Sequence, residues 1–273
     1  MNDKTTVSSG AWTFPLPWLA VLIMALLPWQ SQGANPEVTK LGGEPPKQIL
    51  FVGNSYLYYG DSLHNHVRRL AEAAEIAPLR ELKFRSITIS GGEVGFHPLD
   101  HYLTPNAIGY PEPFEVVILQ GHSAAALDED RSQRFRAAVE TAAELIGQHG
   151  AKPALYMTHA YAEGHKRYAP DNTAKIEALY VEMANQIDAL VIPVGLAFVN
   201  SLQRRPELAL HHSFDHSHPN PLGTYLAACV VYASLYGKPV SGNPYDYYGS
   251  IDQETAAYLQ EVADATVSEF FGR

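Results

Sequence analysis

Cysteine is almost absent from this sequence of 273 residues, in which Cys229 stands alone. A single cysteine excludes an internal disulfide, and it excludes metal sites built on Cys-x-x-Cys pairs. Basic residues are also few: 19 Lys and Arg face 29 Asp and Glu, which gives a net charge of −10. Because no dense cluster of Lys and Arg is present, the chain has no electrostatic surface for nucleic acid. We therefore expect no nucleic-acid partner.

Several site signatures are missing as well. The sequence has no Gly-x-Ser-x-Gly elbow, which argues against an α/β-hydrolase. It has neither Gly-x-Gly-x-x-Gly nor a P-loop, which argues against a nucleotide-binding protein. What the chain does have is 46% hydrophobic residues, enough for one sizeable core.

The first 33 residues have the composition of a secretory signal peptide. A polar start that contains Lys4 is followed by the apolar run from Trp18 to Leu27, and Ser31 and Gly33 supply small residues before a cleavage point. We expect a secreted or periplasmic protein, with an uncleaved N-terminal membrane anchor as the alternative. Residues 34–47 are rich in Pro and Gly and indicate a linker, which leaves 48–273 as the catalytic domain.

Short apolar runs alternate with helical patterns along the rest of the chain. We expect strands at 48–52, 82–89, 114–120, 153–158 and 189–194, and helices at 61–75, 129–148, 173–186, 221–236 and 252–270. This alternation predicts a three-layer, doubly wound α/β fold, with a mainly parallel five-stranded sheet and helices on both faces. Ser55, Gly91 and the segment 120–123 each follow a predicted strand, so they should meet at the ligand-binding edge of the sheet.

Ser55 lies in Gly53-Asn54-Ser55, directly after a buried strand. Two interpretations are open: a nucleophile exposed at the end of the strand, or a turn serine that caps the next helix.

A nucleophilic serine needs a base to take its proton and an acid to orient that base. Asp215 and His218 are separated by two residues, close enough to pair within one turn of a loop. Two alternatives compete, a solvated polar loop and a metal site. The metal site would draw on the histidine-rich tract of His211, His212, Asp215, His216 and His218.

Two further segments offer hydrogen-bond donors for a developing oxyanion. Ser90-Gly91-Gly92 lets a backbone N–H approach a ligand closely, and Gln120-Gly121-His122-Ser123 offers polar side chains. Either segment could equally be an ordinary turn or polar loop.

Taken together, the order of these segments resembles the SGNH, or GDSL-type, hydrolases over roughly residues 48–237. Gly53-Asn54-Ser55 is similar to the family's first block, Gly91 in Ile89-Ser90-Gly91 to its second, and Asp215 and His218 to its final Asp-x-x-His. The likeness is strongest to a branch with a GNS(F/Y) first block, an LQxxS third block, and HPxxxGTYLAAC after the histidine.

The third block departs from the family, which usually carries Gly-x-Asn-Asp with the Asn in the oxyanion hole. No Asn is present here. The resemblance favours Gln120 as the donor, as in carbohydrate acetylesterase branches with a Gln-Gly-Glu-Ser block; Ser123 takes the position if the alignment is made on Gly121.

The resemblance implies a flavodoxin-like SGNH hydrolase fold and a serine esterase that removes acetyl or other short acyl groups from a carbohydrate or small ester. It implies Ser55, His218 and Asp215 as catalytic residues. The N–H groups of Ser55 and Gly91, with Gln120 or Ser123, would form the oxyanion hole, without metal or cofactor. The alternatives are a metal-dependent hydrolase that uses the His211–His218 cluster, and a non-catalytic glycan-binding module.

Overall fold

A computed structural model describes residues 1–2 and 35–273 of the chain. The predicted signal peptide falls on residues 3–34 and so lies outside the described part. Residues 35–47 contain no helix or strand, and partly buried Val38 and Leu41 pack against the core of the domain. Within the described residues, none of the helices has the length and apolar character needed to cross a membrane.

Five parallel strands form the central sheet, in the order β2-β1-β3-β4-β5. Their bounds are β1 Gln48–Gly53, β2 Lys83–Thr88, β3 Val116–Gln120, β4 Lys152–Tyr156 and β5 Leu190–Ile192. This order places the first strand beside the second and third, as in flavodoxin-like folds, whose ligands bind where the strand order reverses. The predicted fold class is confirmed, and the carboxyl ends of β1, β2 and β3 meet at one edge.

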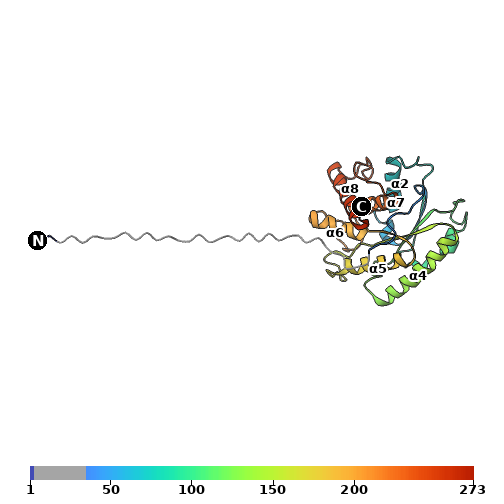
Figure 1. The fold of residues 1–273 in the computed structure, drawn as a ribbon, viewed down its shortest axis with the longest axis horizontal. Coiled ribbons are helices and arrows are strands. Elements are labelled where there is room, and N and C mark those ends of the chain that lie inside the picture. Colours follow the sequence, from blue (N-terminus) through green and yellow to red (C-terminus); the bar gives the residue numbers. More distant parts are fainter. Residues whose placement is uncertain (3–34) are drawn as a thin grey trace. The chain divides into compact units, whose positions relative to one another are not determined.

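Helices cover both faces of the sheet (Figure 1). One face is covered by α2 Leu63–Ala73, α6 Val194–Arg204, α7 Pro221–Tyr236 and α8 Gln253–Phe271, and the other by α3 Leu99–Leu103, α4 Glu129–Gln148 and α5 Asn172–Gln186. The alternation of side chains along β1 explains the two faces: Ile49 and Phe51 enter the first core, and Leu50 and Val52 enter the second.

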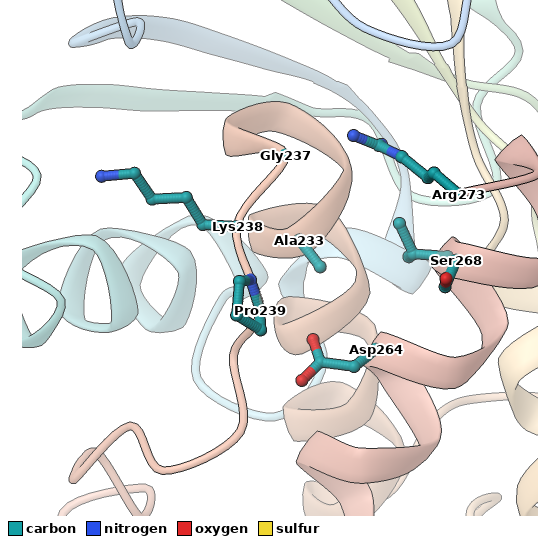
Figure 2. Close-up of a pocket in the computed structure, with 8 residues that line it drawn as sticks. Ala233, Gly237, Lys238, Pro239, Asp264, Ser268 and Arg273 are labelled. Carbon is teal, nitrogen blue, oxygen red and sulfur yellow. The ribbon is translucent and has the colours of Figure 1, made fainter.

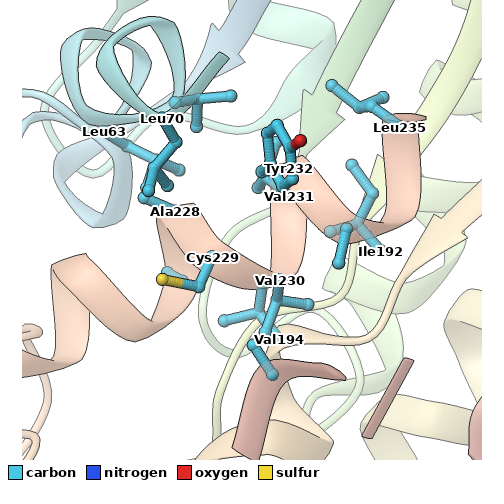
Figure 3. Close-up of a cluster of buried hydrophobic side chains, with 14 of the residues drawn as sticks. Leu63, Leu70, Ile192, Val194, Ala228, Cys229, Val230, Val231, Tyr232 and Leu235 are labelled. Carbon is cyan, nitrogen blue, oxygen red and sulfur yellow. The ribbon is translucent and has the colours of Figure 1, made fainter. Parts of the chain in front are cut away.

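Helix α7 is the centre of the larger core. Its residues from Gly223 to Leu235 are all buried, because α2 and α8 pack on it as well as the sheet. Figure 3 shows Leu63 and Leu70 of α2 and Ile192 of β5 beside the side chains of α7. Cys229 lies in this apolar cluster as a free, buried thiol. Asn220 caps the helix by accepting a hydrogen bond from the N–H of Gly223, and Pro221 stands in its first turn. The residues just before α7 are therefore fixed to the most buried helix of the fold.

Four helical segments were not expected from the sequence pattern, and three of them are short. They are α1 Ser55–Tyr58, the 3-10 turn η1 Val94–Phe96, α3 and α6. The sequence pattern predicts that Gly195 ends the strand at 189–194, whereas the structure places it in the first turn of α6. A side chain there would overlap the carbonyl oxygen of Thr158, so glycine is needed for close packing rather than for a turn.

Close packing also lets us predict the effect on stability of a substitution at Gly223 in α7. A Cβ at this position would overlap the carbonyl oxygen of Leu210, so Gly223→Ala should destabilise the domain by about 1–3 kcal/mol. Gly147 in α4 is the matched control: it is exposed with open space around it, and Gly147→Ala should stabilise the domain by about 0.5–1 kcal/mol. Urea unfolding measures both, and equal effects of the same sign would show that close packing does not set the need for glycine at Gly223.

Candidate active site

Ser55 is the first residue of α1, at the point where β1 ends. The helix is capped by Asn54, whose side-chain oxygen accepts a hydrogen bond from the N–H of Tyr56. Gly53 is required just before it, because a Cβ there would overlap the Gln120 side chain. Since Asn54 performs the capping, Ser55 is not the capping serine that the sequence allowed, and its hydroxyl is available for another partner.

That partner is His218. The Ser55 Oγ lies 2.8 Å from His218 Nε2, and His218 Nδ1 is hydrogen-bonded to Asp215 Oδ2. The other carboxylate oxygen of Asp215 accepts from the N–H groups of Ser217 at 2.9 Å and His218 at 3.0 Å. The three residues named from the sequence thus form one hydrogen-bonded chain from hydroxyl to imidazole to carboxylate.

The Asp215 carboxylate is held in its charged form. Burial alone would raise its pKa, but the hydrogen bonds from the His218 ring and from two backbone N–H groups outweigh burial and lower the pKa below the ordinary value. The loop is itself closed: the N–H of His216 donates to the His212 carbonyl, and the N–H of His212 donates to the His218 carbonyl. His216 has φ of 53°, a left-handed conformation that turns the chain between Asp215 and His218.

Two tyrosines from the segment after Ser55 hold the His218 ring. Tyr59 stacks on it face to face, with ring centroids 4.0 Å apart and planes inclined by 16°. Tyr56 meets it edge-on at 5.7 Å. The sequence does not distinguish these tyrosines from residues that merely pack or bind ligand; the structure shows Tyr56 buried and Tyr59 half-buried against the imidazole.

A second buried histidine supports the loop from behind. The His159 ring lies between Tyr56 and Phe198, 4.2 Å from each, and its Nε2–H donates to the Ser217 carbonyl at 2.9 Å. The Tyr56 hydroxyl shares a hydrogen bond of 2.9 Å with Ser217 Oγ. Burial holds the pKa of His159 well below its ordinary value, so the ring is neutral and packs between Tyr56 and Phe198 as an uncharged aromatic side chain.

The glycine-rich loop after β2 faces the segment that contains Ser55. Asn54 Nδ2 donates to the Gly92 carbonyl at 2.9 Å, which ties this loop to the start of α1. Glu93 fixes the other end of the loop: Arg134 donates to its two carboxylate oxygens, and Arg131 also bonds to it. Hydrogen bonding from Arg134 lowers the pKa of Glu93.

Several backbone N–H groups in the loops at this edge have no acceptor in the described chain, and those of Ser55 and Gly91 are among them. Within residues 35–273 no atom accepts a hydrogen bond from the N–H of Ser55 or from that of Gly91. Gly91 adopts φ of 63°, and open space surrounds the position of its missing Cβ. These two donors match the backbone positions expected from the sequence.

Gln120 requires a correction. Its side chain is fully buried; its oxygen accepts from the N–H of Asn54 at 2.9 Å, and its amide group bonds to the Gly121 carbonyl. No ligand can touch a side chain with no exposed surface, so Gln120 holds the segment of Asn54 and Ser55 in place and is not available as a donor to a bound ligand. The alternative, Ser123, is half-buried and shares a hydrogen bond of 2.8 Å with the Tyr161 hydroxyl.

The histidine-rich tract does not assemble a metal site in the described part of the chain. Among residues 35–273, no group of three His, Cys, Asp or Glu side chains is placed to hold a metal ion. His211 turns inward and donates to the Ala160 carbonyl at 3.0 Å, His212 stacks on Phe214, and His218 faces Asp215 and Ser55.

A pocket of about 250 Å³ lies at the opposite end of α7, beside the end of α8. Figure 2 shows Asp264 pointing toward the segment of Lys238 and Pro239 there. The carboxylate accepts from the N–H groups of Val240 at 2.7 Å and Ser241 at 2.9 Å, so it serves to hold this turn. None of the predicted site residues lines this pocket.

Comparison with known proteins places the fold. No family model and no curated protein matches the sequence. Among solved structures, a DUF4886 family protein from Bacteroides uniformis is similar, with a TM-score of 0.61 and 18% identity over 80% of this chain and 93% of the other. A protein from Slackia heliotrinireducens, proposed to be an SGNH hydrolase, has a TM-score of 0.53 and 21% identity over 69% and 98%.

A catalytic mutant of Axe2, an acetylxylan esterase from Geobacillus stearothermophilus, has a TM-score of 0.51 and 16% identity over 69% of this chain and 93% of the other. The chain has an SGNH hydrolase-like fold. Identities this low establish the architecture and leave substrate and mechanism to be argued from the site.

The buried histidines predict how stability depends on pH. Burial lowers the pKa of His211 from 6.5 to about 4, so the unfolded chain binds a proton more readily than the folded one between these values. Stability should therefore be full above pH 6.5 and fall toward pH 4, by about 1.4 kcal/mol per pH unit for each such histidine. Carboxylates such as Asp215, with a lowered pKa, act only at still lower pH.

Urea unfolding at pH 7, 5.5 and 4.5 measures this slope. His211→Gln should make it shallower, whereas His101→Gln, at an exposed position, controls for the loss of an imidazole. An unchanged slope in His211→Gln would show that this residue does not carry the effect.

Proposed function

We propose that the protein is a serine ester hydrolase. The observation that carries the proposal is the continuous hydrogen-bonded chain from Ser55 Oγ through the His218 ring to Asp215. Such a chain activates a hydroxyl group that is otherwise a weak nucleophile. Ser55, His218 and Asp215 also keep some exposed surface, with 9%, 23% and 25% respectively, so a substrate carbonyl can reach the hydroxyl.

In the first half of the proposed reaction, Ser55 Oγ attacks the ester carbonyl while His218 Nε2 takes the hydroxyl proton. Asp215 holds His218 Nδ1–H and stabilises the positive imidazolium. When the tetrahedral intermediate collapses, the imidazolium gives its proton to the departing alcohol, and the acyl group stays on Ser55. In the second half, water loses a proton to His218 and attacks the acyl carbon. When the second tetrahedral intermediate collapses, the bond between the acyl carbon and Ser55 Oγ breaks, the imidazolium returns its proton to Ser55 Oγ, and the acid is released.

The negative charge that develops on the carbonyl oxygen needs hydrogen-bond donors in place before the reaction. We assign this role to the unpartnered N–H groups of Ser55 and Gly91. Ser123 is the candidate for a side-chain donor, since it lies at this edge and is not fully buried. Loss of one such donor raises the barrier by about 3 kcal/mol in comparable sites.

For the substrate, we propose an acetyl or other short acyl ester of a carbohydrate. Support comes from the structural neighbours, among which are Axe2 and a second acetyl xylan esterase, AlAXEase. We also propose a secreted or periplasmic location, on the composition of residues 1–33.

Removal of the nucleophile or the base tests the mechanism. Ser55→Ala and His218→Ala should each lower kcat for p-nitrophenyl acetate by at least about 10³-fold, because members of such a triad act as a unit. A fluorophosphonate probe should label wild-type Ser55, as identified by mass spectrometry of the peptide. Ser213→Ala, an exposed serine of the same loop, is the matched control and should retain activity.

Activity near the wild-type level in either triad variant would refute this mechanism. Loss of wild-type activity on treatment with EDTA, restored by zinc, would support the metal-dependent alternative instead.

The stacked tyrosine gives a separate prediction. Tyr59→Leu removes the ring that packs on His218, so the imidazole gains freedom and kcat for p-nitrophenyl acetate should fall about tenfold, with KM little changed. Tyr59→Phe keeps the stacked face and should restore kcat to within about twofold. If Tyr59→Phe is as impaired as Tyr59→Leu, the hydroxyl and not the stacking matters.

A further inference from the structure

Four aromatic side chains beside the catalytic histidine form a continuous strip. Tyr58 stacks on Tyr59 at 5.6 Å, Tyr59 meets His212 edge-on at 5.7 Å, and His212 stacks on Phe214 at 4.8 Å. Tyr59 is also the ring that stacks on His218. The aromatic strip, Tyr58, Tyr59, His212 and Phe214, therefore leads from the catalytic imidazole outward to the surface.

The outer end of the strip is open to solvent. Phe214 is 68% exposed, although it stands immediately before the catalytic carboxylate in the sequence. Large hydrophobic side chains with so much exposed surface are few in the described chain: within residues 35–273 the others are Phe96, Tyr168 and Tyr248. An exposed aromatic ring costs solubility, so its place next to a reactive site points to a ligand.

The polar groups of the strip indicate whether it binds an alkyl chain or a ligand that carries hydroxyl groups. In the described part of the chain, neither the Tyr59 hydroxyl nor a ring nitrogen of His212 has a hydrogen-bond partner. At the inner end, the Tyr58 hydroxyl donates to Ser90 Oγ at 3.1 Å, beside the Gly91 turn. An alkyl chain would cover these groups without bonding to them, whereas a ligand with hydroxyls around an apolar face would satisfy both features.

We propose that the aromatic strip is a binding subsite for a sugar ring of the glycan that carries the ester. A pyranose has this dual character: its C–H groups pack on the electron-rich faces of aromatic rings, and its hydroxyls bond at their edges. The inference rests on the proposed function, in that the sugar bears the acyl group that Ser55 attacks. Sugar units beyond the acylated one lie along His212 and Phe214.

Binding is measured in Ser55→Ala, which cannot turn over an ester, and so does not depend on catalysis. The probes are hexasaccharides of β-1,4-linked xylose, glucose and N-acetylglucosamine, titrated by calorimetry. We expect at least one to bind, and Phe214→Ala in the same background to raise its Kd at least tenfold, while Phe214→Trp retains it. Phe96→Ala is the matched control, since Phe96 is 59% exposed and makes no ring contact within residues 35–273.

The kinetic counterpart compares substrates in the Ser55 enzyme. Phe214→Ala should raise KM for an acetylated xylo-oligosaccharide at least tenfold more than it raises KM for p-nitrophenyl acetate, which is too small to span the strip. This difference would not follow from a general loosening of the loop, which would affect both substrates alike.

Three results would overturn the inference. One is the absence of binding by every hexasaccharide, and another is an equal loss of binding in Phe214→Ala and Phe96→Ala. The third is kinetic and uses the long-chain ester p-nitrophenyl decanoate as an additional substrate. If Phe214→Ala raises KM for this ester and not for the acetylated xylo-oligosaccharide, the strip binds the acyl chain. If the oligosaccharide binds through Phe214 but no ester is hydrolysed, the subsite stands and the esterase proposal fails.

Discussion

The hydrogen bond between the Ser55 hydroxyl and the His218 imidazole joins two segments that are 163 residues apart in the chain. Neither segment can make it alone. Ser55 lies at the carboxyl end of β1, the first strand of the chain. His218 follows all five strands in the chain, and its loop must lie at the same edge of the sheet. A contact at 2.8 Å tolerates little displacement, since hydrogen bonds weaken steeply outside a narrow range of distance and angle. The rest of the fold can be understood as the means of holding these two ends in register.

On the side of Ser55, the buried polar groups form a web that links three strand ends. Asn54 is its centre: its N–H donates to Gln120 at the end of β3, its side-chain amide donates to the Gly92 carbonyl after β2, and its side-chain oxygen caps α1. Every bond is buried and satisfied, so displacement of one loop would leave a polar atom without a partner. This explains why an asparagine, and not only a small turn residue, stands before Ser55, and why a polar residue, Gln120, lies in the interior with no exposed surface.

The architecture could be predicted from the sequence, because it depends on local patterns of apolar and polar residues. Five apolar runs that end at polar or glycine residues, separated by helical periodicity, are enough for a doubly wound sheet, and strand order then places Ser55, Gly91 and the segment after β3 together. The predictions that differ from the structure concern contacts between residues that are distant in the sequence. Gly195 stands in the first turn of α6, where the carbonyl of Thr158 leaves no room for a side chain, and the buried Gln120 accepts the hydrogen bond of the Asn54 N–H. The stacking of Tyr59 on His218 is of the same kind: no periodicity separates it from the buried Tyr56 three residues earlier.

The two sides of the His218 imidazole are under different physical constraints. Asn220, two residues after His218, caps α7, and this helix is buried along almost its whole length, so the inner attachment of the loop shares the stability of the core. On the outer side, His218 is covered by Tyr59, which is followed by His212 and the exposed Phe214. An exposed side chain such as that of Phe214 contributes little to the stability of the fold, so residues at the outer end of the strip can be replaced without loss of the fold. If His218 is the base that we propose, a scaffold that fixes it from the core and leaves the surface beyond it unconstrained can keep one reaction while its substrate changes.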